Sequence, residues 1–157
     1  MSSHASTPSA SLPSEHQATS ALVALLKEEQ QKLIAARIDG LPALMESKSV
    51  VVSQLTILIK GRHALLAVDG FEASERGMRD WIATRDSAQI DAEWNGLLAV
   101  SAEAKELNRV NGMLIGRHLV RTNTELNILQ GKPQHTSLYG ANGQSTGKGI
   151  GRGLAIG

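Results

Sequence analysis

The sequence predicts an all-α protein, with an antiparallel helical hairpin and a long third helix in a coiled-coil-like bundle and disordered N- and C-terminal tails. Aromatic residues make up 3% of the 157 residues, and the 41% apolar content is carried by Leu, Ala, Ile and Val. Such aliphatic side chains suit helices that pack ridges into grooves. The run Val50–Val52 lies inside a helical spacing, so it does not indicate a strand. The length suits one domain.

Residues 1–20 predict a disordered arm, because Ser, Thr and Pro fill 11 of these positions (7, 2 and 2). That composition buries too little apolar surface to offset the entropy of ordering. The predicted folded domain therefore covers residues 21–131. Its first helix has its N-cap near Ser14 or Thr19 and runs to about Ile38, where Asp39-Gly40 stops it.

A second helix follows at once, because Pro42 suits the first turn of a helix. We expect this helix to fold back on the first one. Its apolar residues recur at alternating spacings of three and four, which is typical of a coiled-coil seam. The seam comprises Leu41, Leu44, Lys48, Val51, Leu55, Leu58, Arg62 and Leu65, and it is widened by Val52, Ile59 and Leu66.

Asp69-Gly70 ends that helix, and a short helix is predicted from Ser74 to Thr84. The longest predicted helix covers residues 88–130 and ends where Gly131 provides a cap and Pro133 prevents continuation. At 1.5 Å per residue it would reach about 60 Å, longer than the first helix can cover. Part of it should therefore be exposed or bound by a partner. The roles of Phe71 and Trp81, within 66–90, do not follow from the pattern.

Charge is distributed unevenly along the chain. Residues 1–106 hold 10 basic and 14 acidic side chains (net −4), whereas residues 107–157 hold 6 basic side chains and one acidic side chain (net +5). Residues 132–157 contain seven Gly and no acid, so we expect a flexible basic tail. The role of the part after Gln144 stays open.

The sequence excludes most enzyme classes and predicts no cofactor. Without cysteine there is no thiol nucleophile and no thiolate metal site, and no two of the five histidines have the i, i+4 spacing of a shared metal ion. The segment GQSTGKG lacks the spacing and the flanking strand and helix of a phosphate-binding loop. We also expect no membrane insertion, because no run approaches 18–20 apolar residues, and no signal peptide. These features predict a cytoplasmic protein that is not an enzyme.

One segment of the long helix is unusual. The run ELNRVNGMLIGRHL places Asn108, Asn111, Gly112 and Gly116 in the middle of a helix, although Gly costs about 1 kcal/mol there relative to Ala. Such residues are found where another helix approaches closely or where a polar group must be met. They indicate either an internal contact with the first two helices or a surface that binds a partner.

Three segments resemble the flagellar export chaperones of the FlgN type. They are LLKEEQQKLIAARIDGLPALMESKSVVVSQL (25–55), ELNRVNGMLIGRHLVRTNTELNIL (106–129) and SLYGANGQS (137–145). The resemblance implies a cytoplasmic chaperone of the flagellar type III export system. Such a chaperone binds the C-terminal amphipathic segments of hook-filament junction (hook-associated) proteins, prevents their premature assembly and delivers them to the export gate.

The exposed side of the long helix is then the expected client-binding site, with apolar anchors and two amides. Its predicted members are Leu107, Asn108, Asn111, Leu114, Ile115, Leu119, Leu126 and Leu129. The resemblance also implies that Tyr139 docks to the cytoplasmic domain of the export gate, with Gly140 and Gly143 beside it. The alternative for Tyr139 is an aromatic side chain that packs back on the bundle.

A second class of function remains open on the sequence, namely a structural coiled-coil adaptor or a self-associating helical protein without a client. Self-association would cover surplus apolar surface on the long helix. Nucleic acid is not an expected partner, because the basic excess lies in a tail with a single Tyr. Neither the identity of the client subunits, nor their affinity, nor the oligomeric state follows from the chain.

Overall fold

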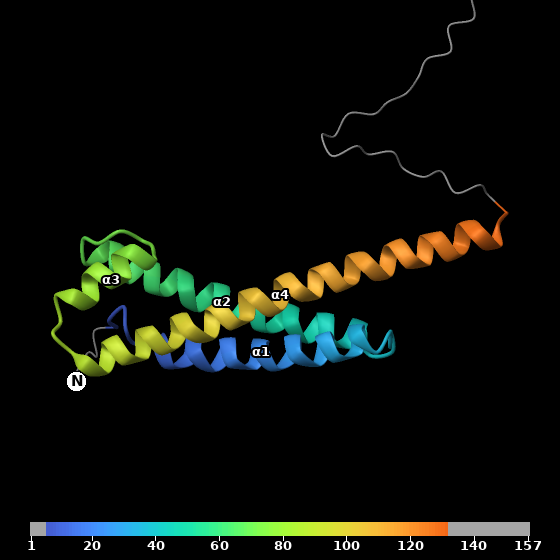
Figure 1. Cartoon of the computed structure of the whole chain (residues 1–157). Helices are drawn as coiled ribbons and strands as arrows, with labels where there is room; N and C mark the ends of the chain where they lie inside the picture. Colours follow the sequence, from blue (N-terminus) through green and yellow to red (C-terminus); the bar gives the residue numbers. More distant parts are fainter. Residues whose placement is uncertain (1–5, 132–157) are drawn as a thin grey trace, which may run out of the picture. The chain divides into compact units, whose positions relative to one another are not determined.

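The computed structural model describes residues 6–131, which form four α-helices and no strand (Figure 1). The helices are α1 (Leu12–Ile34), α2 (Leu41–Val68), α3 (Glu75–Ala83) and α4 (Ala88–Leu129). The predicted all-α class is confirmed, with α1 and α2 as the hairpin and α4 as the long helix. The predicted tail, 132–157, lies outside the described residues.

The first helix begins earlier than the sequence indicated. α1 starts at Leu12, with Pro13 in its first turn, so the prediction of a disordered arm is wrong for residues 12–20. Leu12 and Glu15 are each 1% exposed, and the Ser11 hydroxyl donates a 2.7 Å hydrogen bond to the Glu15 carboxylate. The few apolar and acidic residues of this segment contact other parts of the bundle. The overall composition of residues 1–20 gives no sign of these contacts, because Ser, Thr and Pro dominate it.

The helix also ends at Ile34 instead of Ile38. Ala36 adopts a left-handed conformation (φ 53°), and the Arg37 amide donates to the Lys32 carbonyl at 2.9 Å. This is a Schellman motif in which Ala occupies the position that usually holds Gly, at a cost of roughly 1 kcal/mol. The four residues after it complete the turn, and Gly40 (φ 79°) leads directly into α2.

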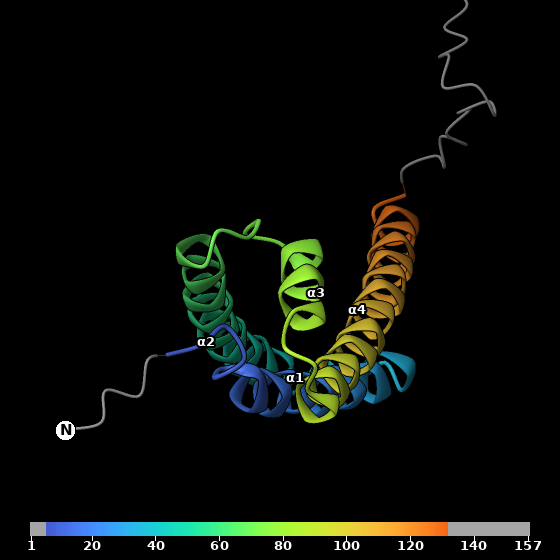
Figure 2. The same cartoon turned by 90° about the vertical axis from the view of Figure 1, so that its left-hand side faces the viewer.

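The hairpin packs along the predicted seam. Leu44, Arg62 and Leu66 are buried on α2, and the intervening seam positions are half-buried. Figures 1 and 2 show α1 and α2 side by side next to the turn that joins them and farther apart toward α3. The alternating spacing of three and four therefore identified the face of α2 that packs on α1. Val52, which was predicted to widen this face, is instead 47% exposed, because it lies on the far edge of the stripe.

A buried ion pair lies inside this hairpin. Arg62 donates to both Glu15 carboxylate oxygens, from Nε at 2.9 Å and from Nη2 at 3.1 Å. The guanidinium also lies 5.1 Å from the centre of the Trp94 ring, a cation–π arrangement. Arg62, one of the two charged residues in the seam, is thus matched by a carboxylate from the predicted arm.

The short helix α3 closes one end of the bundle. Ser74 caps it by accepting a 3.0 Å hydrogen bond from the Gly77 amide. Met78, Trp81 and Ile82 join a core cluster that also contains Leu12, Leu66, Trp94 and Leu97, with Phe71 packed at its edge. The Trp81 indole donates to Asp69 at 2.8 Å. Phe71 and Trp81 are therefore core residues of this end.

The long helix has its predicted bounds within one residue. α4 ends at Leu129, and Gly131 follows with a φ of 62°. Residues up to Leu119 belong to one compact unit, and a second unit begins at Val120. Within the first unit α4 packs on α1, where Val23, Leu26 and Ala104 form a second core cluster.

Candidate functional site

Burial along α4 changes at Asn111. Trp94, Leu97, Ala104 and Asn111 are the buried residues of this helix, and none is buried between Gly112 and Leu129. The N-terminal part of the helix is thus used by the core. The part that follows is the candidate surface for a partner.

Asn111 lies at the boundary and is 1% exposed. Its Nδ2 donates to the Leu26 carbonyl at 2.9 Å and to the Glu29 carboxylate at 2.8 Å. Lys48 donates to both oxygens of the same carboxylate, at 2.8 and 2.9 Å. This buried polar network joins α1, α2 and α4.

The network corrects one part of the sequence-based site. Asn111 was expected on the exposed side of the long helix, but its amide already bonds inside the bundle and is not accessible to a client. The internal contact, the other interpretation of this segment, holds for Asn111. Gly112 and Gly116 differ, because a Cβ added at either position would meet nothing within 4 Å.

The other predicted site residues divide by exposure. Leu107 and Leu114 are half-buried, and Leu107 packs against the second core cluster. Asn108 is exposed. The exposed apolar members are Ile115 (41%), Leu119 (60%), Leu126 (47%) and Leu129 (83%).

Sequence reasoning missed three exposed apolar residues on the same helix, namely Met113, Val120 and Ile128. They fall off the stripe that continues the buried positions, and a pattern that assigns apolar residues to the packed side cannot single them out. Beyond Asn111 only Leu114 and His118 are half-buried, so apolar residues on the other sides of the helix are exposed. The accessible apolar surface is therefore broader than the predicted stripe.

Charged residues on α4 pair along the helix. Arg109 donates to Glu106 at 2.7 and 2.9 Å, and Arg121 donates to Glu125 at 2.9 Å. The hydrogen bonds from Arg109, and secondarily its charge, lower the pKa of the Glu106 carboxyl. Stability from a depressed carboxyl pKa is present above the unfolded value and lost as pH falls through the folded one. This pair is solvent-exposed, so its effect is small.

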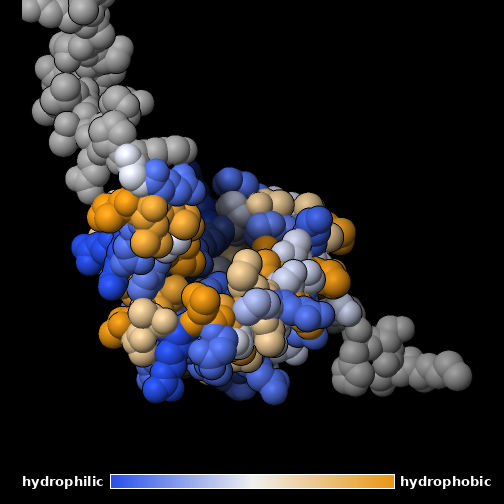
Figure 3. All heavy atoms as spheres, turned by 90° about the vertical axis from the view of Figure 1, so that its right-hand side faces the viewer, coloured by the Kyte–Doolittle hydropathy of each residue, from blue (hydrophilic) through white to orange (hydrophobic). Residues whose placement is uncertain are grey.

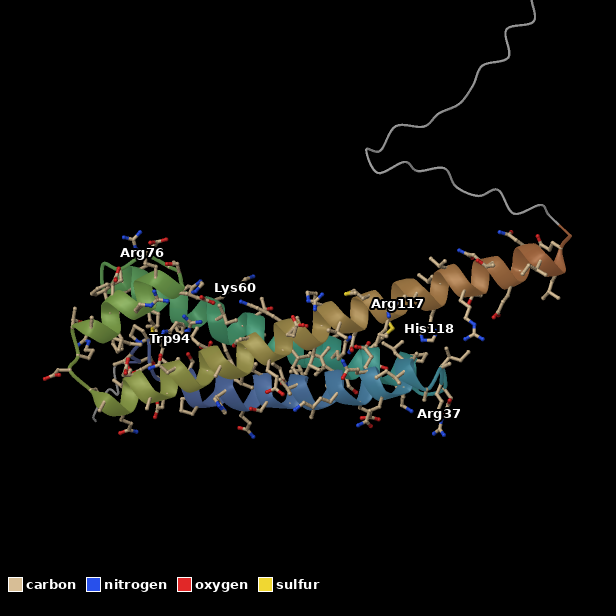
Figure 4. The ribbon with its side chains drawn as sticks, viewed as in Figure 1. Arg37, Lys60, Arg76, Trp94, Arg117 and His118 are labelled. Carbon is tan, nitrogen blue, oxygen red and sulfur yellow. The ribbon has the colours of Figure 1, made fainter. Side chains whose placement is uncertain are left out.

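The described residues, 6–131, contain no cluster of three His, Cys, Asp or Glu side chains that could hold a metal ion. His118, labelled in Figure 4, places its Nε2 within hydrogen-bonding distance of the Leu33 carbonyl. The imidazole thus lies against the C-terminal end of α1. The predicted docking residues Tyr139, Gly140 and Gly143 lie outside the described part of the chain.

A second apolar surface lies on α2. Five large apolar residues of this helix are exposed, namely Met45, Val50, Val52, Ile57 and Val68. By length and composition alone α2 could cross a membrane, and it is the one such helix in the described part of the chain, which is weak evidence for a span. Figure 3, which views the molecule from the right-hand side of Figure 1, shows hydrophobic residues among hydrophilic ones on the surface. A second periodic line in the sequence, offset from the seam and containing Val50, Ile57 and Val68, could have revealed part of the α2 surface.

Comparison with known proteins identifies the family. The FlgN protein family model matches residues 1–147. The flagella synthesis protein FlgN of Proteus mirabilis is 31% identical over 126 residues, covering 79% of this chain and 80% of that protein. The Escherichia coli K12 protein of the same name is 29% identical over 126 residues, with 80% of each chain covered.

The fold has a counterpart among solved structures. A Pseudomonas aeruginosa protein described as a FlgN flagella synthesis protein superimposes with a TM-score of 0.59 at 22% identity, covering 75% of this chain and 91% of that one. That likeness shows the fold, while the family model and the sequence relatives show the descent. The chain therefore belongs to the FlgN family of flagella synthesis proteins.

Proposed function

We propose that this chain is a cytoplasmic export chaperone of the flagellar type III export system. It binds the C-terminal amphipathic segments of hook-filament junction proteins, prevents their premature assembly and delivers them to the export gate. No catalytic role and no cofactor are proposed. Membership of a family named for flagella synthesis supports the flagellar setting.

The observation that carries the proposal is the change in burial along α4. Beyond Asn111 none of its residues is buried, and Ile115 and Leu119 expose 41% and 60% of their surface. Exposed apolar residues on one helix are suited to an amphipathic partner, which docks its own apolar face against them. Asn108, about one turn before Asn111 on the same helix, is also exposed and can meet a polar group of that partner.

Delivery is proposed to use Tyr139, with Gly140 and Gly143 beside it. An aromatic ring offers a large apolar contact at a low cost in rotamer entropy, and its hydroxyl can satisfy a polar rim. This part of the proposal depends on the sequence alone, because these residues lie outside the described range.

The test for client binding is the double substitution Ile115→Ala and Leu119→Ala in the full chain. If both side chains are anchors, the affinity for a C-terminal peptide of a junction protein should fall at least about tenfold. Isothermal titration calorimetry measures the dissociation constant, and circular dichroism checks that the helix content is unchanged. Both side chains are exposed, so the bundle should stay folded.

Ile38→Ala is the matched control, because Ile38 is 82% exposed but lies in the α1–α2 turn. It should leave the affinity unchanged. Equal affinities for the double variant and the parent chain would show that neither Ile115 nor Leu119 is an anchor, which contradicts the proposed site. If the parent chain binds no junction-protein peptide at all, the second candidate, a helical adaptor without a client, is favoured instead.

A further inference from the structure

The outward side of α2 carries a second regular stripe of residues. Its spacings alternate between four and three, as in the seam that packs on α1, but its members fall between the seam positions. We call it the outer stripe, and it comprises Val50, Gln54, Ile57, Gly61, Ala64 and Val68. At 1.5 Å per residue it extends for about 27 Å.

No element of the described chain covers this stripe. Val50, Ile57 and Val68 are 54%, 70% and 82% exposed, and Gln54, Gly61 and Ala64 are also exposed. A Cβ added at Gly61 would meet nothing within 4 Å. The buried residues of α2, such as Leu66, belong to the seam.

The outer stripe also carries no charge. Residues 49–59 include no ionisable side chain, and the two charged seam residues, Lys48 and Arg62, are paired with Glu29 and Glu15 inside the bundle. Lys60 flanks the stripe and is exposed, where its long side chain can remain in solvent (Figure 4). An uncharged, partly apolar strip of this length is suited to another helix.

We propose that the outer stripe pairs two copies of this chain, with α2 of one copy antiparallel to α2 of the other. In antiparallel helices, residues at equal distances on either side of a common midpoint lie opposite each other. With Ile59 as that midpoint, a single register sets Val50 against Val68, Gln54 against Ala64 and Ile57 against Gly61, each from the other copy.

Self-complementarity is the reason to assign a second copy as the occupant. Ile57, the largest apolar side chain of the stripe, faces Gly61, which has none, and the valines meet at both ends. Large residues opposite small ones let two helices approach closely and interdigitate. Because the same patch serves both copies, the contact closes under two-fold symmetry without forming a filament.

The interface is small. Two helices paired over about 27 Å bury on the order of 1,000 Å² in total, at the lower edge of specific interfaces. Dimerisation should therefore be reversible and depend on concentration in the micromolar range. It uses residues different from Ile115 and Leu119, so it can be tested independently of client binding.

The register can be tested by cross-linking, because the chain has no cysteine of its own. Val50→Cys and Val68→Cys are prepared as separate full-length variants and treated with a short bis-maleimide. A mixture of the two should give a cross-linked dimer, while each variant alone should not, since identical positions lie about 27 Å apart. Cross-linking of either variant with itself, or none in the mixture, would overturn the register.

The surface itself is tested by Ile57→Lys, with Ile38→Lys as the control at another exposed apolar position. Sedimentation equilibrium of the parent chain should show a monomer–dimer equilibrium. Ile57→Lys should raise its dissociation constant at least tenfold, and the control should leave it unchanged. The Ile115→Ala/Leu119→Ala variant should still dimerise. A parent chain that stays monomeric in solution, or that instead floats with phospholipid vesicles, contradicts the proposal.

Discussion

At the scale of single residues, buried polar groups define how the helices meet. The Glu15–Arg62 pair is nearly inaccessible, with exposures of 1% and 4%, and each partner compensates the desolvation of the other. The Arg62 Nη1 and Trp94 Nε1 atoms beside it have no partner within the described protein atoms. Such a site tolerates the loss of both charges better than the loss of one.

We therefore predict that Glu15→Leu and Arg62→Met, made singly, each lower the free energy of unfolding by about 3 kcal/mol. The double variant should recover most of that loss, because no unpaired charge remains buried. Urea denaturation followed by circular dichroism measures both effects. As a control, Lys27→Met breaks the exposed Lys27–Glu103 pair and should cost under about 1 kcal/mol. Additive losses in the double variant would contradict the coupling.

At the scale of elements, α3 is held by a contact that leaves no room for a side chain. A Cβ at Gly77 would lie 1.7 Å from the Glu72 carbonyl oxygen, in the loop that precedes the helix. This loop carries the Ser74 cap, and the helix carries Met78 and Trp81 into the core. Only glycine lets the loop fold over the first turn of α3 in this way.

Gly77→Ala should therefore destabilise the protein by at least about 1–3 kcal/mol, because the loop or the helix must move. Gly112→Ala is the matched control, because a Cβ at this position in the middle of α4 would meet nothing within 4 Å. It should raise the free energy of unfolding by up to about 1 kcal/mol. Thermal unfolding of the two variants should thus shift in opposite directions. A shift upward for Gly77→Ala would mean that the loop is not packed against α3.

At the scale of the whole molecule, the first two turns of α1 pack against all three of the other helices. Leu12 packs with Leu66, Trp81 and Trp94, which come from α2, α3 and α4. Glu15 neutralises Arg62 in the same region. The segment that composition marks as an arm is therefore a structural part of the bundle.

Removal of residues 1–20 should consequently expose this cluster and leave Arg62 unpaired, with a loss of several kcal/mol in stability. Removal of residues 1–5 alone is the control, because it retains every residue of the core clusters. Dye binding to exposed apolar surface and thermal unfolding compare the two truncations. If both unfold at the same temperature, Leu12 and Glu15 do not contribute as described.

Local chemistry explains why so much of the fold could be predicted. The signals that set the helices depend on residues close together in the sequence. They are the Asp39-Gly40-Leu41-Pro42 break, the alternating spacing along α2 and the stop at Gly131, and each acts within one or two helical turns. The helix bounds of α2, α3 and α4 followed within a residue or so from these signals. The candidate site could be placed on α4, because its length exceeds that of α1.

What required the tertiary structure was the rotation of each helix and the identity of its partners. Neighbouring positions on a helix differ by 100°, so a stripe pattern could not decide that Asn111 faces Glu29 and Leu26 while Asn108 faces solvent. Nor could composition show that Leu12 and Glu15 meet residues far away in the sequence. Periodicity along one segment determines that a helix has a packed side, but contacts between distant segments decide which side chains that side buries and which it leaves free to bind.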